Sequence, residues 1–571
     1  MTAVASAEAP TRLSESRASR PAKVLLAFVA LLAVYGLLSL FNDPRGTLGT
    51  DTGGKLATLA VMDQRGTFDP DIGYWAERYD PAGALHPLYY TAHIGDRWVN
   101  LTTLPMPVVA RPLYALGGPR AVLLLPMLGA AFAALAARAL ARRVTGGDGW
   151  FAFWTVGLAS PIAIYALDFW EHAPGVALVL WGMVFLWDLV DGRAGWKGAL
   201  ASGALFGAAA TMRTDALVYA AAGTLTAGCV LLVRWRRTGT PRWSWMIRAA
   251  IAWCGGFAGL LVANQLLERA IVGTGIRSGR AASTATAAGG GVRSRMEEAL
   301  TTAIGLNRFE PHTDWVMGAL AVALVAYGAW RLTAPGRSER VLGLVAIAVA
   351  ALLYVVRFAD GLGFVPGVLS ASPLAAAGLV IGWTVKRWRL AGVMALVAAP
   401  VVWVFQYSGG ANPQWGGRYL LVTGTVLVVG GAIVLGATSG PARVVLVALA
   451  VVVTVAGVAW LSQRSHAVAS AMRQMETGPD TVLVSREAHL LREGGAFYRP
   501  DQRWLTAESD RELAAAVAVA RDVGARRLEV VGVAGRAEPR SFDGFERAGS
   551  RRIEFLPGLD VVLVTYTSTG G

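Results

Sequence analysis

One carboxylate in the chain stands in a setting that suits proton transfer. Asp51 lies in residues 49–55, a short polar and glycine-rich stretch that follows the first long apolar run, and a threonine flanks it on each side. A carboxylate close to a membrane surface can act as a general base if it reaches the proton of an acceptor hydroxyl. A solvated loop acid is the alternative, and we favour the catalytic interpretation of Asp51 because of its position and context.

Other acids and histidines lie near the ends of apolar segments or among aromatic residues. Charged groups at membrane depth are costly and tend to be functional. Two acids and a histidine fall within five residues of one predicted turn, for which a short hydrated turn is the alternative interpretation. We interpret five residues as acceptor-binding or substrate-binding groups, or as ligands of a metal ion: Glu171, His172, Asp168, Asp71 and His86.

Three arginines carry a different chemistry. The topology predicted below puts Arg213, Arg357 and Arg418 on the same side of the membrane as Asp51, against the usual bias of basic residues toward the cytoplasm. An arginine fork matches the oxygens of a phosphate. A lipid phosphate near the outer surface would explain their position, although Arg213 next to Asp215 also fits a local ion pair.

The composition determines which elements can position these residues. The chain has 571 residues, of which 54% are hydrophobic and only 16% are charged. This balance is typical of a membrane protein. The net charge is +14, but many basic residues stand at the ends of apolar runs, so we predict no nucleic-acid partner. The two cysteines, Cys229 and Cys254, lie in apolar segments, offer no disulfide framework, and are predicted to be buried.

The apolar runs predict a polytopic α-helical membrane protein with about 13 transmembrane helices, since each span needs about 20 mainly apolar residues. The predicted spans are 24–41, 120–141, 150–167, 173–190, 197–212, 216–233, 245–267, 315–332, 341–357, 364–385, 390–406, 419–437 and 442–461.

The charges between these spans predict the orientation. With residues 1–23 as a disordered cytoplasmic N-terminus, every predicted inner connection is short and basic. The outer side then holds two long loops, 42–119 and 268–314. The first contains interrupted apolar segments at 85–90 and 98–105 that we interpret as interfacial helices. The second contains a low-complexity stretch, 278–291, that we interpret as a mobile lid or linker.

A change in composition marks a separate C-terminal domain. From residue 465 to 571 the apolar runs shorten and charged residues increase. Segments 481–485, 528–533 and 560–565 are typical of strands, and 510–523 of a helix capped by Ser509. The sequence therefore predicts a small α/β domain on the outer side, with a structural or acceptor-binding role.

These features together resemble the GT-C superfamily of polytopic glycosyltransferases, which includes protein O-mannosyltransferases, aminoarabinose transferases and arabinosyltransferases. The resemblance spans residues 24–464 and the outer domain, and includes the stretches HPLYY at 86–90 and GGRYLL at 416–421. It implies an enzyme of the cell membrane that moves a sugar from a polyprenyl-phosphate donor to a hydroxyl of a glycan, lipid or protein acceptor, with inversion.

The resemblance also implies roles for particular residues. Asp51 matches the loop acid of these families and would be the catalytic base, while Arg418, Arg357 and Arg213 would bind the donor phosphate. Thr52 stands where several families carry a second acid. This difference leaves open whether a divalent metal, Mg or Mn, is used.

Two other classes of function remain as alternatives. A transporter or flippase of lipid-linked glycans would also use charged groups in a helical bundle, but transporters usually show internal repeats, and we find none in this sequence. A non-enzymatic scaffold for envelope assembly would give Asp51 no chemical role. Loss or retention of sugar transfer in an Asp51 variant distinguishes these classes.

Overall fold

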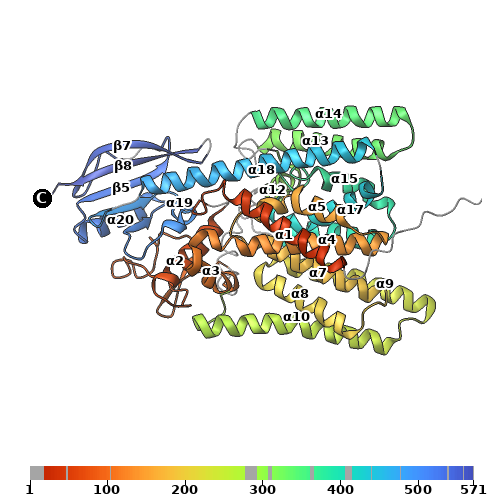
Figure 1. Cartoon of the computed structure of the whole chain (residues 1–571). Coiled ribbons are helices and arrows are strands. Elements are labelled where there is room, and N and C mark those ends of the chain that lie inside the picture. The colour runs from red at the N-terminus through yellow and green to blue at the C-terminus, as the bar shows by residue number, and fades with distance from the viewer. Residues whose placement is uncertain are drawn as a thin grey trace, which may run out of the picture.

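The computed structural model describes most of the chain as a helical bundle with a β-sheet domain at one end (Figure 1). It describes residues 19–46, 49–102, 104–276, 292–306, 311–359, 366–405, 415–438, 440–475, 478–536, 539–556 and 559–569. The N-terminus before residue 19, the low-complexity stretch 278–291 and residues 407–414 lie outside the described residues, and so do the predictions made for them.

Within the described residues, nine helices are long and apolar enough to cross a membrane. They are α1 (Ser19–Ser39), α4 (Leu124–Thr145), α7 (His172–Val190), α9 (Asp215–Thr238), α10 (Trp243–Val272), α13 (Pro311–Thr333), α14 (Arg337–Ala359), α17 (Leu421–Ala437) and α18 (Pro441–Gln474). Each coincides with one of the predicted spans, so the protein is a polytopic helical membrane protein.

The other four predicted spans are shorter or broken. Segment 150–167 divides into α5 (Trp150–Leu158) and α6 (Ile162–Tyr165), and 364–385 contains α15 (Pro373–Ile381) followed by the 3₁₀ turn η1 (Gly382–Thr384). Segments 197–212 and 390–406 form α8 (Trp196–Met212) and α16 (Arg389–Phe405), of 17 residues each. A further helix, α12 (Val292–Ile304), lies in the second predicted outer loop.

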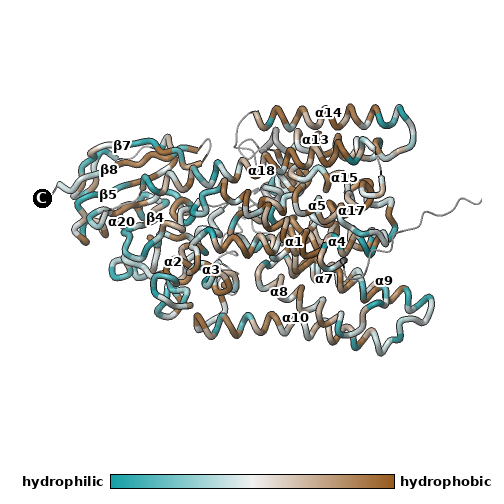
Figure 2. The backbone as a smooth tube through the Cα atoms, viewed as in Figure 1, coloured by the Kyte–Doolittle hydropathy of each residue, from teal (hydrophilic) through white to brown (hydrophobic). Residues whose placement is uncertain are grey.

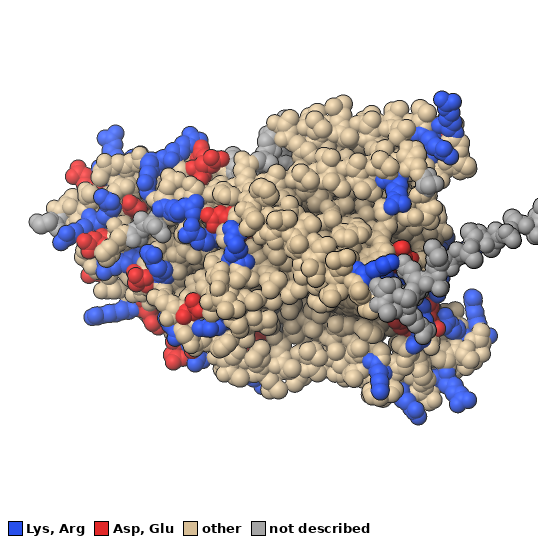
Figure 3. Space-filling view, viewed as in Figure 1, with Lys and Arg blue, Asp and Glu red and all other residues tan. Residues whose placement is uncertain are grey.

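Hydropathy and charge divide the molecule into three zones. The middle of the bundle is hydrophobic along its helices, whereas hydrophilic and hydrophobic residues are mixed in the sheet domain and the far helix ends are hydrophilic (Figure 2). Lysines, arginines, aspartates and glutamates are mixed on the sheet domain, a wide uncharged belt follows, and mainly basic residues stand at the opposite end (Figure 3). A belt of this kind is what a bilayer requires of a protein surface.

The surface of the belt also corrects one prediction. Cys229 on α9 and Cys254 on α10 are exposed rather than buried. Apolar segments predict burial in a soluble protein, but on a membrane helix an apolar face is directed toward lipid. The prediction of two buried cysteines was therefore wrong.

The first predicted outer loop has its own structure. It contains α2 (Thr50–Gln64), a hairpin of β1 (Thr91–Ile94) and β2 (Arg97–Asn100), and α3 (Pro105–Ala121), which is kinked at Gly117 and Gly118. The prediction of interfacial helices at 85–90 and 98–105 was wrong, because 85–90 forms turns and 97–100 forms a strand. The helices of the loop lie on either side of these segments.

The C-terminal domain contains a six-stranded mixed sheet. Its strand order is β4-β3-β5-β8-β7-β6, with β3 (Thr481–Ser485) parallel to β4 (Trp504–Thr506) and β5 (Arg527–Val533), and the remaining neighbours antiparallel. The other strands are β6 (Ser541–Phe542), β7 (Phe545–Leu556) and β8 (Leu559–Ser568). Helix α20 (Asp510–Asp522) begins with the predicted cap, since Ser509 and Glu512 form a reciprocal capping box.

Helix α18 joins the bundle to the sheet domain without a break. It has 34 residues, which gives a length of about 50 Å at 1.5 Å per residue. Residues up to Leu461 pack in the core of the bundle, and residues from Val468 onward pack in the core of the sheet domain. The predicted boundary at residues 464 and 465 therefore falls inside a helix.

The first loop and the sheet domain share one hydrophobic core. Ala57 of α2, Ile72 and Trp98 pack in the same cluster as Trp504 of β4. Hydrogen bonds reinforce this packing, because the Trp75 indole donates to the carbonyl of Trp504 at 2.9 Å. The segments that carry Asp51 and the C-terminal domain therefore form one packed unit.

Candidate functional site

Asp51 lies in the first turn of α2, where the helix packs against the C-terminal domain. Two glycines permit this close approach. A Cβ atom on Gly53 would lie 1.8 Å from the carbonyl oxygen of Arg492, and one on Gly54 would lie 2.7 Å from Oδ1 of Asn100. The glycine-rich character of residues 49–55 thus serves contact between two parts of the chain that are distant in sequence.

Two arginines from different domains hold the carboxylate of Asp51. Oδ1 accepts a hydrogen bond from Nη2 of Arg492 at 3.1 Å, and Oδ2 faces Nη1 of Arg418 at 3.5 Å. Arg492 belongs to the short helix α19 (Leu490–Glu493) of the sheet domain, and Arg418 begins the 3₁₀ turn η2 (Arg418–Leu420). The side chain of Asp51 is 31% exposed, whereas those of the two arginines are 10% exposed or less. The acid is therefore accessible between two largely buried cations.

The predicted turn at 168–172 lies against the same face of α2. The hydroxyl of Thr52 donates to Oδ2 of Asp168 at 2.7 Å, and the ammonium group of Lys55 forms an ion pair with Glu171. Both acids are buried, as is His172. The alternative of a hydrated turn therefore does not fit the structure, since both acids are enclosed and have partners on α2.

Aromatic rings connect the arginines to this turn. The guanidinium of Arg418 lies 5.4 Å from the ring centroid of Trp170 and 4.5 Å from that of Tyr419. The guanidinium of Arg213 lies 5.6 Å from the same Tyr419 ring, so this ring contacts both cations. Arg213 also pairs with Asp215 at 2.9 Å, as its alternative interpretation predicted. Its charge is thus largely compensated, unlike that of a free phosphate-binding group.

His172 occupies an unusual position for a histidine. Its ring stacks on Tyr165 at 5.1 Å and lies 4.3 Å from the ring of Trp170. Among the residues that the structure describes, neither ring nitrogen has a hydrogen-bond partner. Buried polar groups are normally satisfied, so this imidazole is a candidate for contact with a bound substrate.

Two of the predicted site residues, Asp71 and His86, have structural contacts in the first loop. Asp71 accepts backbone N–H groups of Gly73 and Trp98 at 3.0 and 2.9 Å and pairs with Arg65, which fixes the local loop. His86 is buried in the core shared with the sheet domain, and its Nδ1 accepts the N–H of Leu88. Arg357 lies in the last turn of α14, and its role as a phosphate-binding residue stays a prediction.

The acids near Asp51 are not arranged as a metal site. Over the described part of the chain, no group of three or more histidine, cysteine or acidic side chains could hold a metal ion. Glu171 is paired with Lys55, Asp168 accepts from Thr52, and Asp51 faces two cations. This donor set does not fit Mg or Mn, and positive charge at the site comes from arginine and lysine.

Two residues that the sequence did not single out are central to the geometry. Arg492 stands 441 residues after Asp51 in the chain, in a domain to which only a structural or acceptor-binding role was assigned. Lys55 is fully buried, three residues beyond Thr52. A lysine inside a glycine-rich apolar helix is itself a signal, since buried lysines require a paired acid.

A small apolar cavity lies beside the arginine that faces Asp51. It has a volume of about 190 Å³ and is lined by Tyr419 and Leu420 of η2, together with Ala303, Pro400 and Trp403. Arg418 directly precedes Tyr419 in the chain. A cation and an apolar cavity thus lie next to each other, which is the combination that a lipid phosphate needs.

No family model matches the chain, and no curated protein sequence is similar to it. Among solved structures, the chain is similar over most of its length to membrane glycosyltransferases of the GT-C class.

Three of these structures represent the class. ArnT from Cupriavidus metallidurans, bound to undecaprenyl phosphate, shares 16% identity at a TM-score of 0.39, over 94% of this chain and 97% of that one. AglB is an archaeal oligosaccharyltransferase from Archaeoglobus fulgidus, solved in complex with an inhibitory peptide and a dolichol-phosphate. It shares 11% sequence identity at a TM-score of 0.41, over 88% of this chain and 69% of that one. The arabinosyltransferase EmbB from Mycobacterium smegmatis shares 15% sequence identity at a TM-score of 0.35, over 82% of this chain and 43% of that one.

Proposed function

We propose that the protein is a membrane glycosyltransferase that moves a sugar from a polyprenyl-phosphate donor to an acceptor hydroxyl on the outer face of the cytoplasmic membrane. The observation that carries the proposal is the carboxylate of Asp51, held between Arg418 of the bundle and Arg492 of the C-terminal domain. An accessible acid between two cations supplies both a base and the positive charge that a phosphate leaving group requires.

Asp51 acts as the general base in this proposal. A general base must reach the proton that it accepts, and the side chain of Asp51 is 31% exposed. The contact between Asp51 and Arg418 is long at 3.5 Å, and in this proposal Arg418 turns toward the donor phosphate. The carboxylate of Asp51 accepts the proton of the acceptor hydroxyl.

The reaction is a single displacement. The acceptor oxygen forms a bond to the anomeric carbon as the bond from that carbon to the phosphate oxygen breaks, and the electron pair leaves with the phosphate. The acceptor proton passes to Asp51. Arg418 stabilises the charge that builds on the phosphate, as preorganised cations do at a developing anion. Attack from the opposite face predicts inversion at the anomeric carbon.

Other groups near Asp51 hold the parts in place. The apolar cavity beside Tyr419 and Leu420 would take isoprenoid carbons while the phosphate lies at Arg418. Arg213, already paired with Asp215, contributes to the potential at Tyr419. His172 and Trp170 would contact the sugar or the acceptor, because aromatic rings and an unsatisfied imidazole lie at this point. Arg357, in the last turn of α14, is a further candidate cation for the donor phosphate.

Substitution of Asp51 tests the proposal directly. We expect Asp51→Asn to lower sugar transfer about 10²–10⁴-fold, because the amide cannot accept the proton. The assay uses membranes with overexpressed protein and a radiolabelled polyprenyl-phosphate sugar. Asp96→Asn, at an exposed acid of the same loop, is the matched control and should retain transfer.

The same assay separates the enzyme from a transporter. A transferase breaks the bond between sugar and phosphate and releases polyprenyl phosphate, whereas a flippase leaves the lipid-linked sugar intact. Full transfer by Asp51→Asn at normal protein levels would contradict the proposed mechanism.

A further inference from the structure

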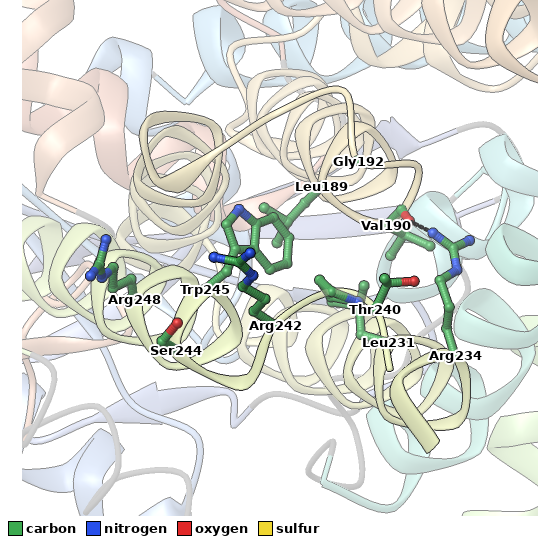
Figure 4. Close-up of a pocket in the computed structure, with 11 residues that line it drawn as sticks. Leu189, Val190, Gly192, Leu231, Arg234, Thr240, Arg242, Ser244, Trp245 and Arg248 are labelled. Atoms are coloured by element: carbon green, nitrogen blue, oxygen red, sulfur yellow. Dashed lines mark hydrogen bonds between the residues drawn. The ribbon is translucent and has the colours of Figure 1, made fainter. Parts of the chain in front are cut away.

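A polar pocket lies far from Asp51, at the connection between α9 and α10 (Figure 4). Its volume is about 550 Å³. The other end of α10 packs on the first-loop hairpin, since Val272 shares a cluster with Val99. A helix of 30 residues spans about 45 Å, which puts the pocket at the end of the bundle opposite to the C-terminal domain.

Three arginines line this pocket without an acid to balance them. Arg234, Arg242 and Arg248 are spread along it in Figure 4, and no lining residue is acidic. Among the described residues, none of the three forms an ion pair, although Arg234 donates to the carbonyl of Val190 at 2.6 Å. The neighbouring connections differ, because Arg193 and Arg387 both pair with Asp191 there. The pocket is therefore a concentrated positive site.

The rest of the lining is suited to a molecule with a polar head and an apolar body. Ser244 and Thr240 add hydroxyl donors, while Leu189, Leu231 and Trp245 add apolar walls. On the same first turns of α10, Trp243 and Ile247 are 52% and 44% exposed, as expected of residues at a membrane interface. The pocket thus opens where helix surface meets headgroup level.

We propose that this pocket binds the phosphate headgroup of an anionic bilayer lipid in the leaflet opposite to the C-terminal domain. Arginine forks recognise phosphate oxygens, and basic pockets between membrane helices are suited to lipid head groups. A soluble phosphate ester shares the charged part of this chemistry. The apolar walls and the exposed Trp243 favour the lipid, because the acyl chains of a lipid can cover apolar surface that a soluble ester would leave in water.

The test compares two double variants that remove equal charge. Arg242→Gln with Arg248→Gln removes two pocket cations, whereas Arg236→Gln with Arg237→Gln removes two exposed cations of the same connection that do not line the pocket. Purified full-length protein in detergent is titrated with phosphatidylglycerol and, separately, phosphatidylcholine, and bound lipid is counted by native mass spectrometry. Detergent removes the bilayer surface potential, so only specific contacts remain.

We expect wild-type protein to bind phosphatidylglycerol in preference to phosphatidylcholine. The pocket variant should bind phosphatidylglycerol at least about tenfold more weakly, whereas the affinity of the control variant should change little. Equal loss in both variants would overturn the proposal, because it would show attraction by net charge alone. Displacement of phosphatidylglycerol by millimolar inorganic phosphate would overturn the choice of a lipid. Unchanged thermal unfolding of both variants would show that folding does not cause the difference.

Discussion

Arg492 is the residue whose role the sequence could least reveal. It donates to Asp51 from 441 positions away and also to the hydroxyl of Thr50 at 3.3 Å, so it fixes the first turn of α2. We expect Arg492→Gln to lower the kcat of sugar transfer about 10²-fold, since a small misplacement of a catalytic group has an effect of this size. The KM for the donor should change little, because Arg418 rather than Arg492 meets the phosphate.

Two variants separate positioning from folding in this prediction. Arg492→Lys keeps the charge and should restore part of the kcat. Arg499→Gln removes an exposed arginine of the same domain and should retain full activity. A rise in KM with unchanged kcat in Arg492→Gln would contradict the positioning role.

His86 contributes a pH-dependent term to stability rather than to chemistry. Burial lowers the pKa of His86 to about 4, whereas an unfolded histidine has a pKa of about 6.5. The unfolded chain therefore binds a proton in this range that the folded chain does not, and stability falls as the pH drops from about 6.5 to about 4. Between pH 7.5 and pH 5 this titration lowers the free energy of unfolding by about 2 kcal/mol.

Thermal unfolding of purified protein at these two pH values checks this expectation. His86→Gln is less stable at neutral pH but should show a smaller fall between pH 7.5 and 5, because the titrating group is gone. His466→Gln, at an exposed position of α18, should keep the wild-type pH dependence. An unchanged pH dependence in His86→Gln would show that other groups cause it.

The sequence predicted part of this residue-scale picture. Position after the first span singled out Asp51, and the bias of charge singled out Arg418. The cost of charge at membrane depth singled out the acids at 168 and 171, and the structure brings these four residues together. Their chemical roles stay predictions. Asp71 and His86 carry the same residue types in similar surroundings, and only the tertiary packing shows that they support the fold of the loop.

At the scale of elements, the junction between α2 and α19 is the part most sensitive to size. The missing side chain of Gly53 leaves room for the carbonyl of Arg492, which a Cβ atom would approach to 1.8 Å. We expect Gly53→Ala to separate the two helices, move Arg492 away from Asp51 and lower transfer by about 10²-fold. Transfer assays at matched protein levels measure the effect.

Helix propensity provides the control for this variant. In the interior of a helix, alanine is more favourable than glycine by about 1 kcal/mol. If Gly53→Ala acted only on helix propensity, it would therefore stabilise α2. Gly255→Ala in α10 meets no atom within 4 Å and should retain activity. Normal transfer by Gly53→Ala would contradict the close contact.

Broken or short helices explain why hydropathy predicted more long spans than the nine among the described residues. In 150–167, Pro161 lacks an N–H group and disfavours a helix in the residue before it, so α5 ends at Leu158. Non-helical backbone at this depth is tolerated where protein encloses it, and residues 161–173 are buried. The break brings the turn with Asp168 and Glu171 into the interior beside α2, whereas composition alone cannot distinguish a buried turn from a span.

For the whole molecule, the two charged ends have different chemistry. Near the sheet domain, Arg418 and Arg492 face the carboxylate of Asp51. In the pocket at the other end, none of the described lining residues is acidic. The first arrangement is the one on which the proposed transfer reaction depends. The second is the basis of the proposed lipid-headgroup site, and the predicted orientation puts that end in the cytoplasm.

The predicted orientation can be tested by cysteine labelling in intact cells. Cys229 and Cys254 are first replaced by alanine, because both are exposed. Ser550→Cys then reports on the sheet domain and Thr238→Cys on the end of α9, and both positions are exposed. We expect a membrane-impermeant thiol reagent to label Ser550→Cys only, and both variants after the membrane is permeabilised. The positive-inside bias of the connections is the physical reason. Labelling of Thr238→Cys alone would reverse the topology and place Asp51 on the cytoplasmic side, where an outer-face transfer reaction has no access to it.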